Sequence, residues 1–140
     1  MLKAMEYKVL VVDNKPEGLE LTVKELGRRG LNVIAANTFE EAAEWLKADG
    51  KIHAVVSEYA LPRSSYDPSE MQGEEVFRSF LSLRYEVLLY LYTQMQDLRN
   101  LTCGGTLNGY FFKGEYVFSD MARRIKAEVA NKNRAPFYEA

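Results

Sequence analysis

"AVVSEYALP", residues 54–62, is the stretch of sequence that decides the predicted fold. It opens with small and β-branched apolar residues, continues into a carboxylate at Glu58, and ends at Pro62. This pattern is typical of a short, fully buried strand that runs into a surface loop. It places an acidic side chain at a strand tip, which is where parallel α/β sheets carry their binding crevice.

Five apolar runs alternate with helical periodicity along the chain. The predicted strands cover residues 7–12, 31–36, 52–57, 87–92 and 109–113. Helices are predicted at residues 16–30, 38–50, 73–83 and 119–130; the second opens with a capping box from Thr38 to Glu41 and turns Trp45 inward. A weak helix is predicted at 95–101, followed by a flexible glycine pair at 104–105. Continuously apolar strands need helices on both sheet faces, so we predict an α/β fold, a doubly wound five-stranded parallel sheet of order 2-1-3-4-5, flavodoxin-like.

The composition narrows the class of protein. The 140 residues fit one domain, and 47% hydrophobic with 27% charged residues is usual for a globular protein. A single cysteine, Cys103, and a single histidine, His53, exclude an internal disulfide and a histidine–cysteine metal cluster. The net charge of −2 gives no general attraction to nucleic acid or to an acidic membrane, and Arg123, Arg124 and Lys126 are expected to complement a helix dipole. No signal peptide or spanning segment is recognisable, so we expect a cytoplasmic protein.

The predicted topology gathers five positions at one edge of the sheet: Asp13, Asn14, Glu58, Leu91 (or its neighbour Tyr92) and Lys113. Their order and spacing resemble a response-regulator receiver domain over residues 7–129. That family has an acidic pair after the first strand, a phosphoacceptor aspartate after the third, a hydroxyl residue ending the fourth and a lysine ending the fifth. The resemblance implies the receiver fold, and it puts Tyr110 at the position of the switch-type aromatic residue.

The same positions depart from the chemistry of that family. Asn14 removes one negative charge, Glu58 carries an extra methylene, and Leu91 is counted at the hydroxyl position, with Thr93 as a substitute only if the strand shifts by two residues. Gly114 follows Lys113 where receivers usually have proline. We therefore expect a degenerate phosphoacceptor site, a pseudo-receiver, without magnesium and without phosphotransfer.

Purely structural roles for the same residues stay open as alternatives. Asp13 can cap the first helix, and Tyr110 can simply pack against the domain. Lys113 and Glu58 can form an ion pair across the crevice, or Asp13 and Glu58 can hold a cation weakly. His53 is expected to be a hydrogen-bonded structural residue, not a metal ligand.

The tail carries a second resemblance. In residues 135–140, "APFYEA", Pro136 is predicted to open a new helix. This segment is similar to the junction after the N-terminal wing domain of bacterial Orn/Lys/Arg decarboxylases. The resemblance implies a receiver-like domain at residues 1–130 and, at residues 131–140, the start of a linker or helix into a downstream domain that would bind pyridoxal phosphate.

Two functions are therefore expected, neither with catalysis inside residues 1–140. The first is subunit assembly or regulation in an amino-acid decarboxylase, by contact with protein partners or by self-association. The second is an atypical response regulator that signals by protein contact, with Glu58 in place of the acceptor aspartate. For the first function, Tyr59, Tyr66, Tyr90 and Tyr92 are candidate contact residues; the alternative is that several of them pack against helices. No nucleic acid or membrane partner is expected.

Overall fold

The computed structural model describes residues 7–94, 97 and 107–138, and for residues 133–138 the backbone alone. Seven strands and four helices lie in this part of the chain. The strands are β1 (Lys8–Val12), β2 (Asn32–Ala36), β3 (Ala54–Ser57), β4 (Ala60–Pro62), β5 (Glu70–Gln72), β6 (Leu88–Thr93) and β7 (Gly109–Phe112). The helices are α1 (Pro16–Arg28), α2 (Phe39–Ala48), α3 (Glu74–Leu83) and α5 (Phe118–Tyr138).

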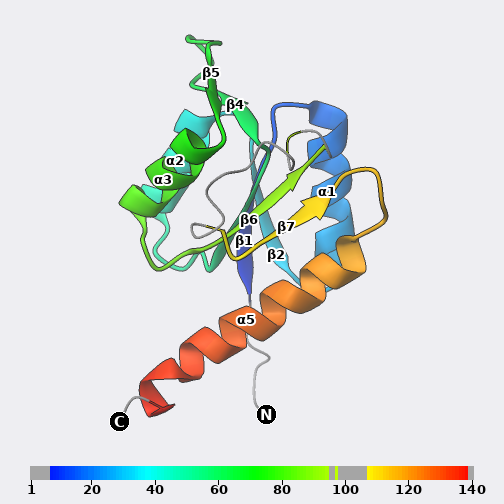
Figure 1. The fold of residues 1–140 in the computed structure, drawn as a ribbon, viewed down its shortest axis with the longest axis vertical. Helices are drawn as coiled ribbons and strands as arrows, with labels where there is room; N and C mark the ends of the chain where they lie inside the picture. Colours follow the sequence, from blue (N-terminus) through cyan, green and yellow to red (C-terminus); the bar gives the residue numbers. More distant parts are fainter. Residues whose placement is uncertain (1–6, 95–96, 98–106, 139–140) are drawn as a thin grey trace.

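The main sheet has five parallel strands in the order β2-β1-β3-β6-β7. With β6 and β7 as the fourth and fifth strands of this sheet, the order is the predicted 2-1-3-4-5, and the fold prediction is confirmed. All four residues of β3 and all six of β6 are buried, as expected for strands covered on both faces. Figure 1 shows the helices on either side of the sheet.

The main sheet divides the hydrophobic core into two clusters, one on each face. On one face, α1 and α5 pack on Val9, Val11 and Tyr90. On the other face, α2 and α3 pack on Leu10 and Leu89. Alternate residues of the strands therefore serve different clusters, and both clusters hold the carboxyl ends of the strands in a fixed register.

The ends of α1 and α2 follow the sequence signals with small differences. Thr38 Oγ1 accepts a hydrogen bond from the Glu41 amide at 3.1 Å, and Glu41 reaches back to the amide of Asn37, 3.0 Å away. Gly30, just after α1, has φ +89°, a conformation that glycine adopts without a steric penalty. Trp45 is 40% exposed, so its predicted inward position is wrong.

A two-stranded antiparallel ladder was missed by the sequence prediction. It joins β4 to β5, with Leu61 opposite Met71, and both side chains are buried in the cluster under α2 and α3. The hairpin rises above the main sheet in Figure 1 and carries Tyr66, which is 95% exposed, between its strands. Three-residue strands give too short a periodicity to be recognised in a sequence.

The last helix differs from its prediction. One continuous helix runs to Tyr138, so Pro136 lies in its last turn and does not open a new helix. Alanine, glutamate, lysine and arginine between residues 127 and 135 favour the helical conformation, which explains the extension. The predicted helix at 95–101 and the glycine pair at 104–105 lie outside the described residues, apart from Asp97. None of the helices in the described part of the chain is long and apolar enough to cross a membrane.

Candidate functional site

The candidate site lies where the carboxyl ends of four strands meet. Asp13 follows β1, Glu58 follows β3, Thr93 ends β6 and Lys113 follows β7. The Lys113 ammonium is 2.7 Å from Asp13 Oδ2 and 2.5 Å from Glu58 Oε2. The three side chains are only 12%, 5% and 9% exposed, respectively. The structure therefore brings three of the predicted site residues together in one buried ion cluster.

Asp13 is held by the turn that follows β1. Its Oδ1 accepts the amide of Lys15 at 3.0 Å, and its own amide donates to the carbonyl of Ala36 at 3.1 Å. Lys15, not Asp13, is the N-cap of α1, so the interpretation of Asp13 as a helix cap is wrong. Gly18 lies beside the carboxylate, because a Cβ at this position would be 3.2 Å from Asp13 Oδ2. The small residue leaves room for the ion pair.

Both oxygens of Glu58 are in contact with neighbouring groups. Oε1 accepts the amide of Tyr59 at 2.9 Å and also the hydroxyl of Thr93. Oε2 has no hydrogen bond in the described part of the molecule, although the Lys113 ammonium lies close to it. We therefore treat this contact as an ion pair without an aligned hydrogen bond. The structure thus contains the predicted pairing of Lys113 with Glu58 across the crevice.

Thr93 occupies the hydroxyl position, which corrects the placement of Leu91 there. Leu91 is fully buried in the core under α2 and α3. Strand β6 ends at Thr93, which pairs with Phe112 and lies about 7 Å further along the strand than Leu91. Its hydroxyl donates either to Glu58 or to Asp97 Oδ2, which is 2.9 Å away. The signal was present in the sequence, since Thr93 is the first hydroxyl after the apolar run.

Opposing effects act on the charge of Lys113. Burial alone lowers the pKa of this lysine, but its ion pairs with Asp13 and Glu58 outweigh burial and raise the pKa above its ordinary value. The ammonium also lies 5.4 Å from the centre of the Tyr92 ring, which favours the cation. Lys113 is therefore the positive charge that neutralises this crevice.

The residues present do not fit a divalent cation. Magnesium needs several oxygen ligands, usually carboxylates and waters, in an octahedral arrangement. Here Lys113 already contacts both buried carboxylates, Asn14 is exposed and uncharged, and the described residues contain no group of three acidic, histidine or cysteine side chains suited to a metal. A dication in this space would lie beside the ammonium group and repel it.

The positions beside Lys113 also have physical explanations. A Cβ on Gly114 would overlap with the Phe112 ring, so a residue with a side chain does not fit this turn as it stands. Tyr110 on the edge strand β7 is 59% exposed, which excludes the interpretation of its ring as a core residue. Tyr90 and Tyr92 are buried, so for these two the packing alternative holds and a contact role is wrong. Tyr59 is half-buried, and Tyr66 alone of the four is strongly exposed.

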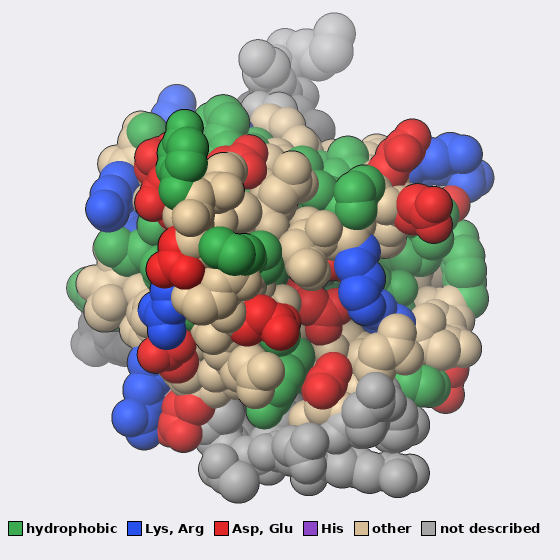
Figure 2. All heavy atoms as spheres, turned by 90° about the horizontal axis from the view of Figure 1, so that it is seen from above, with side chains coloured by type: hydrophobic (Ala, Val, Ile, Leu, Met, Phe, Trp, Pro, Cys, Tyr) green, Lys and Arg blue, Asp and Glu red, His purple; other side chains and the backbone are tan. Residues whose placement is uncertain are grey.

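The surface around the crevice has no single sign of charge. Figure 2, a view onto the hairpin end of the molecule, shows acidic and basic side chains intermingled. One such pair joins Arg63, which follows β4, to Glu75 on α3, at 3.1 Å. This face therefore offers mixed polar contacts, in agreement with the absence of a strong charge signal in the sequence.

Comparison with known proteins shows the fold. No family model and no curated protein matches the sequence. Among solved structures, the chain resembles a response-regulator receiver domain protein from Clostridium thermocellum, with a TM-score of 0.76 and 19% identity over 91% of this chain and 97% of the other. A CheY-like receiver domain protein from Methanospirillum hungatei gives 0.74 and 18%, over 94% and 99%. The response regulator TrrA from Thermotoga maritima, solved with magnesium and BeF, gives 0.71 and 21%, over 86% and 97%. The chain therefore has the receiver fold.

Proposed function

We propose that this chain is a receiver-like signalling domain that acts through contacts with protein partners and not through phosphotransfer. The proposal is supported by the receiver fold and by one observation above all: the Lys113 ammonium contacts both carboxylates of the crevice. The crevice is closed by its own residues.

The closed crevice opposes phosphotransfer in two ways. An acceptor carboxylate has to present a free oxygen in line with the phosphoryl group, with a metal ion to neutralise the developing charge. Glu58 Oε1 already accepts the Tyr59 amide and lies against the Thr93 hydroxyl, and Oε2 faces the Lys113 ammonium. Opening this arrangement would leave buried charges unpaired, which is costly.

Membership of a larger decarboxylase is a finer form of this proposal; it rests on the tail resemblance together with compatible segments at residues 38–41 and 109–118. The continuous course of α5 through Pro136 removes the helix break that supported the junction. The response-regulator-like form is therefore the one we put first. A wing-domain role, with pyridoxal phosphate bound by a downstream domain, stays a prediction.

Incubation with acetyl phosphate and magnesium tests the proposal. We expect intact-mass spectrometry to show no phosphoryl adduct, because no carboxylate oxygen of the crevice is free. A receiver domain with an acceptor aspartate, treated in parallel, shows that the reagent is active. A labile adduct on Glu58 or Asp13 would overturn the proposal.

A further inference from the structure

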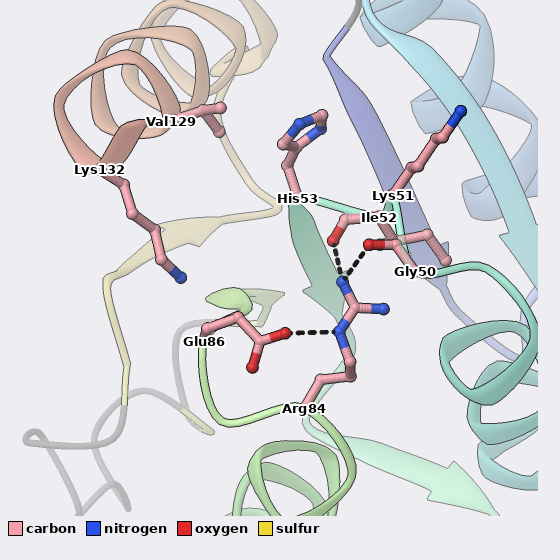
Figure 3. Close-up of a pocket in the computed structure, with 8 residues that line it drawn as sticks. All are labelled: Gly50, Lys51, Ile52, His53, Arg84, Glu86, Val129 and Lys132. Atoms are coloured by element: carbon pink, nitrogen blue, oxygen red, sulfur yellow. Dashed lines mark hydrogen bonds and ion pairs between the residues drawn. The ribbon is translucent and has the colours of Figure 1, made fainter. Parts of the chain in front are cut away.

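A pocket lies at the edge of the sheet opposite to the crevice. It opens where the chain enters β3 and β6 and where the second half of α5 crosses the sheet, and it encloses about 180 Å³. Figure 3 shows Arg84 and Glu86 on one side, with His53, Val129 and Lys132 around the space. Val129 and Ile52 give it an apolar portion, since both are buried core residues.

Arg84 is the fixed part of this pocket. Its five N–H groups are all used: four bonds go to the carbonyls of Leu46, Asp49, Gly50 and Ile52, and one goes to Glu86 Oε1 at 2.9 Å. These carbonyls lie at the end of α2 and in the segment before β3. Arg84 therefore holds the wall in place and has no donor left for a ligand, and Glu86 neutralises its charge.

His53 supplies a donor of defined orientation. Its Nδ1 accepts the Lys8 amide at 3.0 Å, so in the neutral ring the proton is on Nε2. Burial lowers the pKa of His53, and the nearby cations Arg84, Lys8 and Lys132 lower it further. Nε2 has no hydrogen-bond partner among the described residues, and the neutral ring therefore offers one N–H group.

Lys132 supplies the charge. No ion pair of this side chain occurs within the described part of the molecule, where its electrostatic neighbours are Glu86 and Arg84. Burial lowers the pKa of Lys132, and attraction by Glu86 offsets this only in part. Lys51 is also a lining residue, but Figure 3 shows its side chain directed away from the others. The ammonium of Lys132 is therefore the available cation of the pocket.

We propose that this pocket binds a small oxyanion, a carboxylate or phosphate group on a compact ligand, between the Lys132 ammonium and His53 Nε2. The available groups are donors, and the one lining carboxylate, Glu86, is already paired with Arg84. An anion completes this arrangement, whereas a cation would meet Lys132. A cavity of about 150 Å³ holds benzene, so the ligand has on the order of six heavy atoms.

The site would connect ligand binding to the end of the chain. Lys132 lies on α5 beyond Val129, which is the last buried residue of this helix among the side chains that the structure describes. His53 precedes β3, whose other end leads to Glu58. A bound oxyanion would thus fasten the distal turns of α5 to the sheet.

NMR titration of the ¹⁵N-labelled chain tests the proposal with two probes, sodium phosphate and sodium pyruvate, at constant ionic strength in chloride. We expect a dissociation constant on the order of 1 mM. Shifts of amide signals should centre on residues 50–53, 86 and 132. Phosphate alone, pyruvate alone or both binding would each support the site and identify the source of the oxyanion.

Two matched variants make the result decisive. Lys132→Gln removes the proposed cation and should weaken binding by about tenfold or more, because a charged hydrogen bond is lost. Lys47→Gln makes the same charge change on an exposed part of α2 outside the pocket and should leave the affinity unchanged. No shift with either probe, unchanged affinity in Lys132→Gln, or an equal loss in Lys47→Gln would overturn the proposal.

Discussion

The two edges of the sheet treat charge differently. At the carboxyl ends of the strands, Lys113 is shared by two buried carboxylates, Asp13 and Glu58. At the opposite edge, Arg84 pairs with one carboxylate and donates its other N–H groups to carbonyl oxygens. The Lys132 ammonium and His53 Nε2 are then available to bind a ligand. The edge at which receiver-like folds carry out their chemistry is thus the closed one, and the other edge has the space and the donors for a ligand.

This contrast shows why the fold does not determine the function here. The same sheet positions the residues at both edges, and the receiver fold is intact. Function depends on whether a charged group has a partner inside the protein. In the crevice the charged groups have partners, so the charges stabilise the domain. In the pocket, the Lys132 ammonium and His53 Nε2 have no such partner among the described residues.

Lys113→Met should give the largest effect and would test whether the crevice is a stabilising ion cluster. Asp13 and Glu58 would remain as buried carboxylates without a counter-ion, and we expect a loss of about 3–5 kcal/mol in the free energy of unfolding. Urea unfolding followed by circular dichroism measures it. The matched control is Lys24→Met, an exposed lysine of α1, which should change stability by less than about 0.5 kcal/mol.

The double variant Lys113→Met with Glu58→Gln tests whether the loss of stability comes from repulsion between the two buried carboxylates. Removal of one of the two like charges should recover part of the lost stability, since the remaining carboxylate then lies beside a neutral amide. A loss below about 1 kcal/mol in Lys113→Met, with no recovery in the double variant, would show that the crevice is well solvated and that its charges are not coupled.

Arg84→Met should give a smaller loss, of about 2 kcal/mol, at the opposite edge. The substitution leaves up to four carbonyl oxygens without their charged donor, but several lie near solvent and can bind water instead. Thermal unfolding measures the change, with Arg78→Met as the control because the side chain of Arg78 is 71% exposed on α3. An equal effect of the two substitutions would contradict the role of Arg84 in fixing the pocket wall.

The sequence determined the architecture more completely than the site. Runs such as residues 9–12 and 87–92 are so continuously apolar that only burial on both faces accommodates them, and this predicts the parallel sheet and, with right-handed crossovers, its order. Asp13, Glu58 and Lys113 follow from that topology because they come directly after three parallel strands, β1, β3 and β7, whose carboxyl ends lie at the same side of the sheet. Their assembly into one ion cluster required coordinates, since a strand pattern gives no side-chain distances.

The errors came from features that depend on register and local context. Counting back from Tyr110 with the spacing usual in receivers places the hydroxyl position at Leu91, but the residue at the end of β6 in this chain is Thr93, two positions further on. The strands of the β4–β5 hairpin are too short to be predicted, and the preference of proline for the first turn of a helix predicts a start at Pro136, which instead lies in the last turn of α5. The pocket was not foreseen either, since its side chains come from segments distant in the sequence, such as His53 and Lys132.

The smallest expected effect is a pH dependence of the free energy of unfolding, which we expect from the pocket edge and not from the crevice. The pKa of His53 is lowered from 6.5 in the folded protein. On acidification the unfolded chain therefore binds a proton at a higher pH than the folded chain does. The stability that this histidine contributes is complete above pH 6.5 and is lost as the pH falls through that value toward the lower folded pKa. Because the ring is only partly buried, we expect less than about 1 kcal/mol between pH 7 and pH 5.

His53→Gln isolates this contribution, because the chain has a single histidine and the lowered carboxyl pKa values of Asp49 and Glu86 start from 3.8 and 4.5, below this range. Urea midpoints at pH 7, 6 and 5 should decline in the parent chain and stay level in the variant. Lys113, whose pKa is raised above 10.5, keeps its charge over the same range, so the crevice lysine contributes nothing to the slope. A parallel decline in both proteins would place the titrating group elsewhere and remove the pH difference between the two edges.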